Sequence, residues 1–177
     1  LELLKKYDIV QTLHNVGAIL LRNFSVNTAD QFLFIAKMIT NDLMSDNGEH
    51  NPHPEIDGVY TPVSYSAKEK LLWHNENSFN QTWPLMIMFG AAKTADQGGE
   101  TPIVDSRSML KYLDKHIVEE FKNKGVMYVR THGFGFGRSW QETYRVNSKI
   151  ELEKKFTDNN IQFEWCGDDQ LITKQVK

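Results

Sequence analysis

His74 and Glu76 lie two residues apart in an apolar run, Leu72–Phe79, that is typical of a β-strand. Side chains alternate between the two faces of a strand, so these two are predicted to point the same way. An imidazole and a carboxylate on one face provide two of the three ligands of a facial triad that binds non-haem Fe(II). Because six His and 23 acidic residues in 177 positions produce about 0.8 such pairs by chance, the surrounding sequence has to support this interpretation.

A second stretch that could do chemistry runs from Gly98 through Gly99 and Glu100 to Thr101. Two glycines permit a tight turn and a close approach of the backbone. The Thr101 hydroxyl can donate a hydrogen bond to an anion. Taken alone, a Gly-Gly pair is more typical of a hairpin turn than of a binding site, so this stretch gains its meaning from the His74–Glu76 pair.

The elements that would position these residues follow from the apolar periodicity of the chain. Capping boxes at Thr28 and Ser148 begin two helices, and Gly17 and Gly125 end two others. Helices are predicted over residues 1–16, 28–45, 106–124 and 148–160. Strands are predicted over residues 18–24, 59–61, 63–65, 71–76, 85–89, 101–104, 126–131, 162–165 and 171–174, with a surface loop over residues 46–58.

The order of these elements predicts a mainly β fold with helical insertions. Strands follow one another too directly for a βαβ fold with a parallel sheet. An antiparallel sandwich or jelly roll fits the order better. No repeat or linker divides the chain, so residues 1–177 are predicted to form a single domain or part of one.

Composition excludes several classes of partner. The net charge of −3, with 20 scattered Lys and Arg, gives no basic surface for nucleic acid or an anionic membrane. The longest apolar runs are far shorter than the roughly 20 residues that span a bilayer, so we expect a cytoplasmic protein. Cys166 is the only cysteine and excludes an internal disulfide. The chain starts at Leu1 without an initiator Met, so we expect that it was shortened at this end.

Several motifs in order carry a resemblance to a known family. The pattern Trp73-His74-x-Glu76-x-Ser78-Phe79 is followed by Gly98-Gly99-Glu100-Thr101, and Thr101 lies 25 residues after Glu76. This resembles the taurine dioxygenase and clavaminate synthase family of Fe(II)/2-oxoglutarate-dependent oxygenases. Further stretches resemble the branch that hydroxylates amino acids or nonribosomal peptides, namely residues 59–61, 125–130 and 139–141.

The resemblance implies a role for each site residue. His74 and Glu76 would be the catalytic iron ligands, and Thr101 would hydrogen-bond a carboxylate of the cosubstrate 2-oxoglutarate. The reaction would consume O₂, release succinate and CO₂, and hydroxylate an unactivated C–H bond of an amino acid or amino-acid-derived small molecule. A carrier protein is one way of presenting such a substrate. The carboxylate of Glu76 favours hydroxylation or desaturation over halogenation, and the implied fold is a distorted double-stranded β-helix.

Two residues of the family pattern have no counterpart in this sequence. The family's third iron ligand, a distal His, and the Arg that binds 2-oxoglutarate are expected after residue 177, so the jelly roll is expected to be incomplete at this end. The alternative is a non-catalytic jelly-roll fragment or binding module. His132 is a weaker candidate ligand, because it aligns with a segment that the family does not use for metal. Substrate identity, stereochemistry and oligomeric state stay open.

One glycine-rich loop, Gly133–Arg138, superficially resembles a dinucleotide-binding motif. Its third glycine comes one position too early, and no βαβ unit follows it. We therefore interpret it as an aromatic, flexible loop that faces the substrate.

Overall fold

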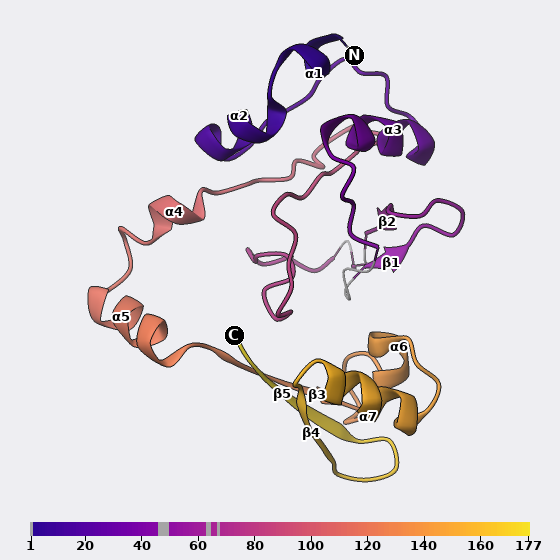
Figure 1. Ribbon diagram of the computed structural model, residues 1–177, viewed down its shortest axis with the longest axis vertical. Helices are drawn as coiled ribbons and strands as arrows, with labels where there is room; N and C mark the ends of the chain where they lie inside the picture. Colours follow the sequence, from indigo (N-terminus) through magenta and orange to yellow (C-terminus); the bar gives the residue numbers. More distant parts are fainter. Residues whose placement is uncertain (1, 46–49, 63–64, 67) are drawn as a thin grey trace. The chain divides into compact units, whose positions relative to one another are not determined.

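The computed structural model describes residues 2–45, 50–62, 65–66 and 68–177, and it divides the chain into two compact units. The first unit contains residues 1–70 and 84–111, and the second contains residues 71–83 and 112–177. Figure 1 gives the order of the helices and strands along the chain. Whether residues 1–177 form one domain stays a prediction.

The helices of the first unit begin and end at residues with clear local signals. They are α1 (Glu2–Lys6), α2 (Ile9–Val16), α3 (Ala29–Ile39) and α4 (Ser106–Met109). The single helix predicted over residues 1–16 is divided, because the Asp8 carboxylate accepts a hydrogen bond from the Gln11 backbone N–H at 2.8 Å and starts a new helix. Gly17 ends α2 at φ 86°, as predicted.

Helix α3 confirms the predicted capping box but is shorter than predicted. The Thr28 side chain accepts from the Gln31 backbone, and the Gln31 side chain accepts from the Thr28 backbone in return. The helix ends at Ile39, where the predicted helix continued to Ser45, because Thr40 takes extended backbone angles at φ −151° and ψ 144°.

Two short strands complete the first unit. Strand β1 (Asn51–Pro52) pairs antiparallel with β2 (Tyr60–Thr61), which confirms most of the strand predicted over residues 59–61. The predicted loop over residues 46–58 therefore contains β1, and its residues 46–49 lie outside the described residues. Residues 63 and 64 of the strand predicted over 63–65 also lie outside them.

The second unit is built on a three-stranded antiparallel sheet. Its strands are β3 (Met127–His132), β4 (Gln162–Trp165) and β5 (Leu171–Val176), in the order β3-β5-β4. All three lie within two residues of their predicted bounds. The register places His132 opposite Leu171 and Arg130 opposite Thr173. These four side chains therefore share one face of the sheet.

Helices α5 (Lys115–Lys124), α6 (Trp140–Tyr144) and α7 (Lys149–Asp158) belong to the same unit. Helix α7 begins as predicted, since the Ser148 side chain accepts from the Glu151 backbone. Helices α6 and α7 pack against the sheet (Figure 1), and the core contains Trp140, Val146, Leu152, Phe156 and Leu171. The last three of these side chains are fully buried.

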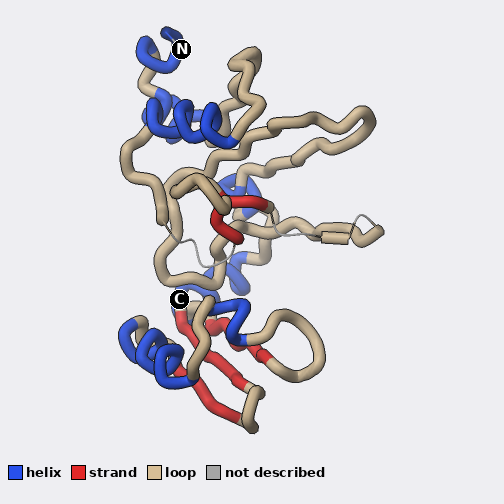
Figure 2. Tube along the Cα trace, turned by 90° about the vertical axis from the view of Figure 1, so that its right-hand side faces the viewer, coloured by secondary structure: helices blue, strands red, loops and turns tan. Residues whose placement is uncertain are grey.

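Four predicted strands do not form among the described residues. They were predicted over residues 18–24, 71–76, 85–89 and 101–104. Figure 2 draws these segments as loop. A strand needs a partner for its backbone N–H and C=O groups, and no ladder forms with these segments. Large apolar side chains along them are consequently exposed, among them Leu20, Leu72, Leu85, Phe89 and Ile103.

The helix predicted over residues 106–124 is also divided, into α4 and α5. The Asp114 carboxylate accepts a hydrogen bond from the His116 backbone N–H at 2.7 Å and begins α5, and Gly125 ends it at φ 73°. The described residues thus contain more helix than strand. The prediction of a mainly β content is therefore wrong for the described residues, and the closed jelly roll stays a prediction.

Candidate metal centre

The segment that contains His74 belongs to the second unit and has no regular secondary structure up to Asn75. A turn follows directly after this stretch, and Asn77 within it takes left-handed backbone angles at φ 56°. Asn is the non-glycine residue, together with Asp, that best tolerates this region. The predicted strand is therefore replaced by a stretch without regular secondary structure that ends in a turn.

The structure brings His74 and Glu76 together. The His74 Nδ1 atom lies 2.7 Å from the Leu72 carbonyl oxygen and donates its hydrogen to it. The other ring nitrogen, Nε2, lies 3.3 Å from Glu76 Oε1. The His74 side chain is 46% exposed and that of Glu76 is 26% exposed, so both are accessible to a ligand. With Nδ1 held by the carbonyl, Nε2 is the nitrogen directed at the carboxylate.

This geometry fits two positions of a metal site. Two ligand atoms that each lie ~2.1 Å from one ion at a right angle are about 3 Å apart, close to the 3.3 Å between Nε2 and Oε1. Metal-bound histidines commonly donate their second ring N–H to a carbonyl, as His74 does to Leu72. An imidazole nitrogen and a carboxylate oxygen suit Fe(II). Within the described ranges, no group of three or more His, Cys, Asp or Glu is placed to hold a metal.

Thr101 lies in the first unit, so the structure does not place it in one compact unit with the metal pair. Gly98 and Gly99 before it have positive φ angles of 69° and 80°, a conformation that glycine favours, and the turn predicted from them stays a prediction. A Cβ atom on Gly99 would lie 2.8 Å from that of Ala95, so this position needs glycine for space as well. Thr101 itself is exposed, and its role toward 2-oxoglutarate stays a prediction.

His132 is a packed residue. Its side chain is 3% exposed, its Nδ1 donates to the Arg138 carbonyl at 3.3 Å, and its ring stacks edge-on with Tyr144 at 5.4 Å between centroids. Burial lowers the pKa of the His132 imidazole; the hydrogen bond to Arg138 opposes this effect, and the charge of Arg130 adds to it. Its buried Nε2 atom has no hydrogen-bond partner among the described residues.

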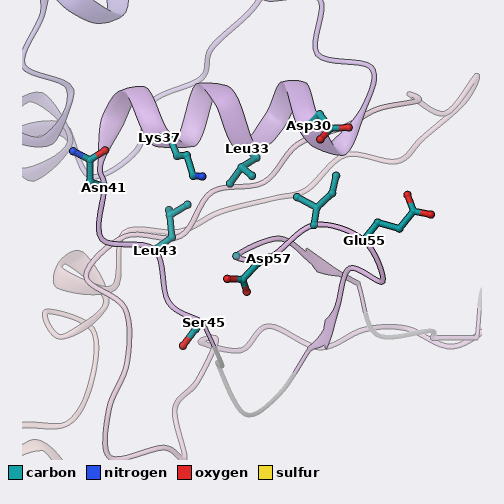
Figure 3. A pocket seen from close by; sticks show the side chains of 10 residues that line it. Asp30, Leu33, Lys37, Asn41, Leu43, Ser45, Glu55 and Asp57 are labelled. Atoms are coloured by element: carbon teal, nitrogen blue, oxygen red, sulfur yellow. The ribbon is translucent and has the colours of Figure 1, made fainter.

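The first unit has an open pocket of about 460 Å³ (Figure 3), which the sequence did not indicate. It lies between α3 and the residues before β2, and Lys37 faces it from the helix. Three carboxylates share the lining, those of Asp30, Glu55 and Asp57. All four charged residues are exposed, which makes the pocket a solvated polar surface.

Family comparison connects this chain to enzymes of one class. Residues 2–171 match the family described as taurine catabolism dioxygenase TauD, TfdA family. The chain belongs to this family, which confirms the resemblance found in the sequence. Members are Fe(II)/2-oxoglutarate dioxygenases, and membership implies the double-stranded β-helix fold.

Two curated relatives match almost the whole chain. The dapdiamide synthesis protein DdaC of Enterobacter agglomerans is 35% identical over 177 residues, which are 99% of this chain and 54% of the relative. A clavaminate synthase-like protein of Arabidopsis thaliana is 29% identical over 174 residues, which are 93% of this chain and 53% of the relative. The chain therefore spans about half the length of the curated relatives it matches. No solved structure matches it.

In the described part of the chain, no helix has the length and apolar character needed to cross a membrane.

Proposed function

We propose that the whole protein is an Fe(II)/2-oxoglutarate-dependent oxygenase that hydroxylates an amino acid or an amino-acid-derived small molecule and releases succinate and CO₂. The observation that carries this proposal is the 3.3 Å approach of His74 Nε2 to Glu76 Oε1. Family membership over residues 2–171 supports it independently.

In this proposal the chain holds two of the iron ligands. The Leu72 carbonyl fixes the His74 ring through Nδ1 and so directs Nε2 toward the metal position. Glu76 supplies a carboxylate oxygen on the same side. When bound, the iron would supply the activation of O₂ that no side chain can provide. The Thr101 hydroxyl would donate to a carboxylate oxygen of 2-oxoglutarate, and the distal His and the Arg remain predicted after residue 177.

The substrate class rests on the resemblance and on charge. One relative is named for dapdiamide synthesis, which supports a biosynthetic role for this protein too. The net charge of −3 supports a small-molecule substrate over nucleic acid or an anionic membrane. Presentation of the substrate by a carrier protein belongs to the same proposal.

The experiment is anaerobic binding of Fe(II) and 2-oxoglutarate to the full-length protein, followed by the visible metal-to-ligand charge-transfer band. We expect the band in the wild type and its loss in the double variant His74→Ala, Glu76→Ala. His116→Ala is the matched control, because His116 lies exposed on α5 and should leave the band intact.

Two results would contradict the proposal. One is a folded wild type without the band, which would support the non-catalytic binding module. The other is an undiminished band in the double variant, which would mean that other residues bind the iron.

A further inference from the structure

The turn that follows the metal pair is attached to the sheet of the second unit by two basic side chains. We propose that Arg130 and Lys177 are positioning residues that hold the turn over residues 77–83 and thereby orient His74 and Glu76 for metal binding. This inference rests on the proposed function of that pair. The sequence indicated no positioning role for either residue: Arg130 lies in a stretch that resembles the family, and Lys177 looks like an ordinary surface charge.

Arg130 reaches the turn from β3. Its guanidinium carbon lies 4.3 Å from the centroid of the Phe79 ring, well within the range of a cation–π interaction. Arg130 points to the same face of the sheet as His132, and its cross-strand neighbour Thr173 is 3% exposed. The guanidinium is therefore held on the buried face of a formed sheet, and Phe79 packs on it from the turn.

Lys177 reaches the same turn from the end of β5. Its ammonium donates to the Ser78 carbonyl at 2.9 Å and lies 3.5 Å from the Asn77 carbonyl and 4.2 Å from the centroid of the Trp83 ring. Its backbone is fixed by a pair of hydrogen bonds with Val126, at 2.8 and 3.1 Å. One cation thus joins the backbone and an aromatic ring of the turn to an anchored strand end.

The turn needs such support because of Asn77. This residue is buried at 3% exposure, follows Glu76 directly and has φ 56°, a conformation that costs free energy even in Asn, the non-glycine residue that together with Asp tolerates it best. The Asn77 side chain accepts a hydrogen bond from Asn80 at 2.5 Å, which closes the turn locally. The Lys177 ammonium adds the contact to the Asn77 and Ser78 carbonyls from outside the turn.

Attachment of the turn has a direct consequence for the metal pair. The segment up to Asn75 forms no strand, so no ladder of backbone hydrogen bonds fixes the direction of its side chains. Glu76 is joined covalently to Asn77, and a change in the Asn77 backbone angles therefore redirects its carboxylate. Releasing the turn would widen the range of distances between Nε2 and Oε1 and weaken metal binding.

The test measures anaerobic Fe(II) affinity in the full-length protein by competition with a chelator, without substrate. We expect Arg130→Met and Lys177→Met each to weaken Fe(II) binding by about 3- to 10-fold, somewhat less than the 10- to 100-fold typical of direct partners of a ligand. Arg130→Lys keeps a cation over Phe79 and should recover most of the affinity. Lys149→Met is the matched control, because it removes a similar 4.2 Å contact to Trp165 at another place in the unit.

The outcomes separate this inference from the proposed function. A wild type that does not bind Fe(II) overturns the proposed function. A wild type that binds, with Arg130→Met and Lys177→Met no weaker than Lys149→Met, overturns the positioning role alone. If Arg130→Met fails to fold, Phe79→Leu removes the ring from the same contact, and unchanged Fe(II) affinity in a folded Phe79→Leu variant counts against the role of Arg130.

Discussion

Strands are predicted both for residues 126–131 of the second unit and for residues 85–89 of the first unit, and among the described residues only the former pair with a partner strand. Residues 127–132 alternate between exposed and less exposed positions and pair with β5 along their whole length. Residues 85–89 are a continuous apolar run that forms no ladder, and Leu85, Ile87 and Phe89 are exposed. The difference teaches that a strand-like sequence becomes a strand only where a partner strand is present to bond its backbone.

The predicted iron ligands and the predicted 2-oxoglutarate-binding residue are divided between the same two units. His74 and Glu76 belong to the unit with the formed sheet, and the turn after them packs on β3 and β5. Thr101 belongs to the other unit and lies in a segment without a ladder. We therefore expect iron binding to depend on the stability of the second unit.

The largest effect on stability should come from a Phe→Ala substitution in the core of the second unit, compared with the same substitution in residues 85–89 of the first unit. Phe156→Ala empties a fully buried position of the core and should lower the free energy of unfolding of the second unit by about 3–5 kcal/mol. Phe89→Ala removes a side chain that is 68% exposed and should change the free energy of unfolding of the first unit by less than about 0.5 kcal/mol. Urea denaturation followed by far-ultraviolet circular dichroism measures both, because both units contain helices. Equal losses would show that residues 85–89 are packed and would remove the contrast.

A pair of glycines tests how closely the chain packs within the second unit. Gly133 has φ 78°, and a Cβ atom there would collide with the Asp169 carbonyl; Gly135 has φ 87° with open space around the same position. Gly133→Ala should cost about 2–4 kcal/mol in unfolding free energy, since it adds a backbone collision to the unfavourable φ. Gly135→Ala should cost only about 1 kcal/mol. Thermal unfolding of the two variants compares them directly, and equal costs would argue against the close approach of Asp169.

Acidification should weaken the second unit through His132. Burial lowers the pKa of this imidazole below its ordinary value of 6.5, so the unfolded chain takes up the proton first. The stability is then complete above pH ~6.5 and falls, by at most about 1.4 kcal/mol per pH unit, as the pH drops toward the folded-state pKa. Urea unfolding at several pH values from 7.5 to 5.5 should give a steeper dependence for the wild type than for His132→Gln. An identical dependence in both would show that His132 does not contribute.

The smallest effect concerns the start of α7. Ser148→Ala removes the side-chain oxygen that accepts from the Glu151 backbone N–H at 3.3 Å, and it should cost about 1 kcal/mol of unfolding free energy. Ser148→Asp keeps an acceptor at this position and should restore the loss. Chemical denaturation of both variants provides the measurement, and a neutral Ser148→Ala would mean that the cap does not limit the stability of this unit.

The sequence was most informative where structure depends on near neighbours. The caps at Thr28 and Ser148 and the stops at Gly17 and Gly125 were predicted because each involves residues within one helical turn. Helix α6 was missed although Ser139 and Glu142 form a capping box, since five residues are too few to show an apolar period. The four absent strands could not be judged from the sequence, because partner strands do not show in a single stretch of residues.

The candidate site shows the same limit. The proximity of His74 and Glu76 followed from their spacing, although a turn and not a strand brings them to 3.3 Å. Their likeness to a known motif extended the prediction to Thr101. The contacts of Arg130 and Lys177 were not predictable from the sequence. Arg130 lies 51 positions from Phe79 and Lys177 lies 99 positions from Ser78, and the contacts also depend on the register of β3 and β5.

The most direct test of the central claim, that His74 and Glu76 hold the iron, is Fe(II) affinity measured anaerobically in the full-length protein with and without 2-oxoglutarate. We predict that His74→Ala and Glu76→Ala each abolish tight Fe(II) binding under both conditions. Thr101→Val should retain Fe(II) binding and require more 2-oxoglutarate for saturation, because it lacks only the hydroxyl donor. Fe(II) affinity that is unchanged in both His74→Ala and Glu76→Ala would contradict the account.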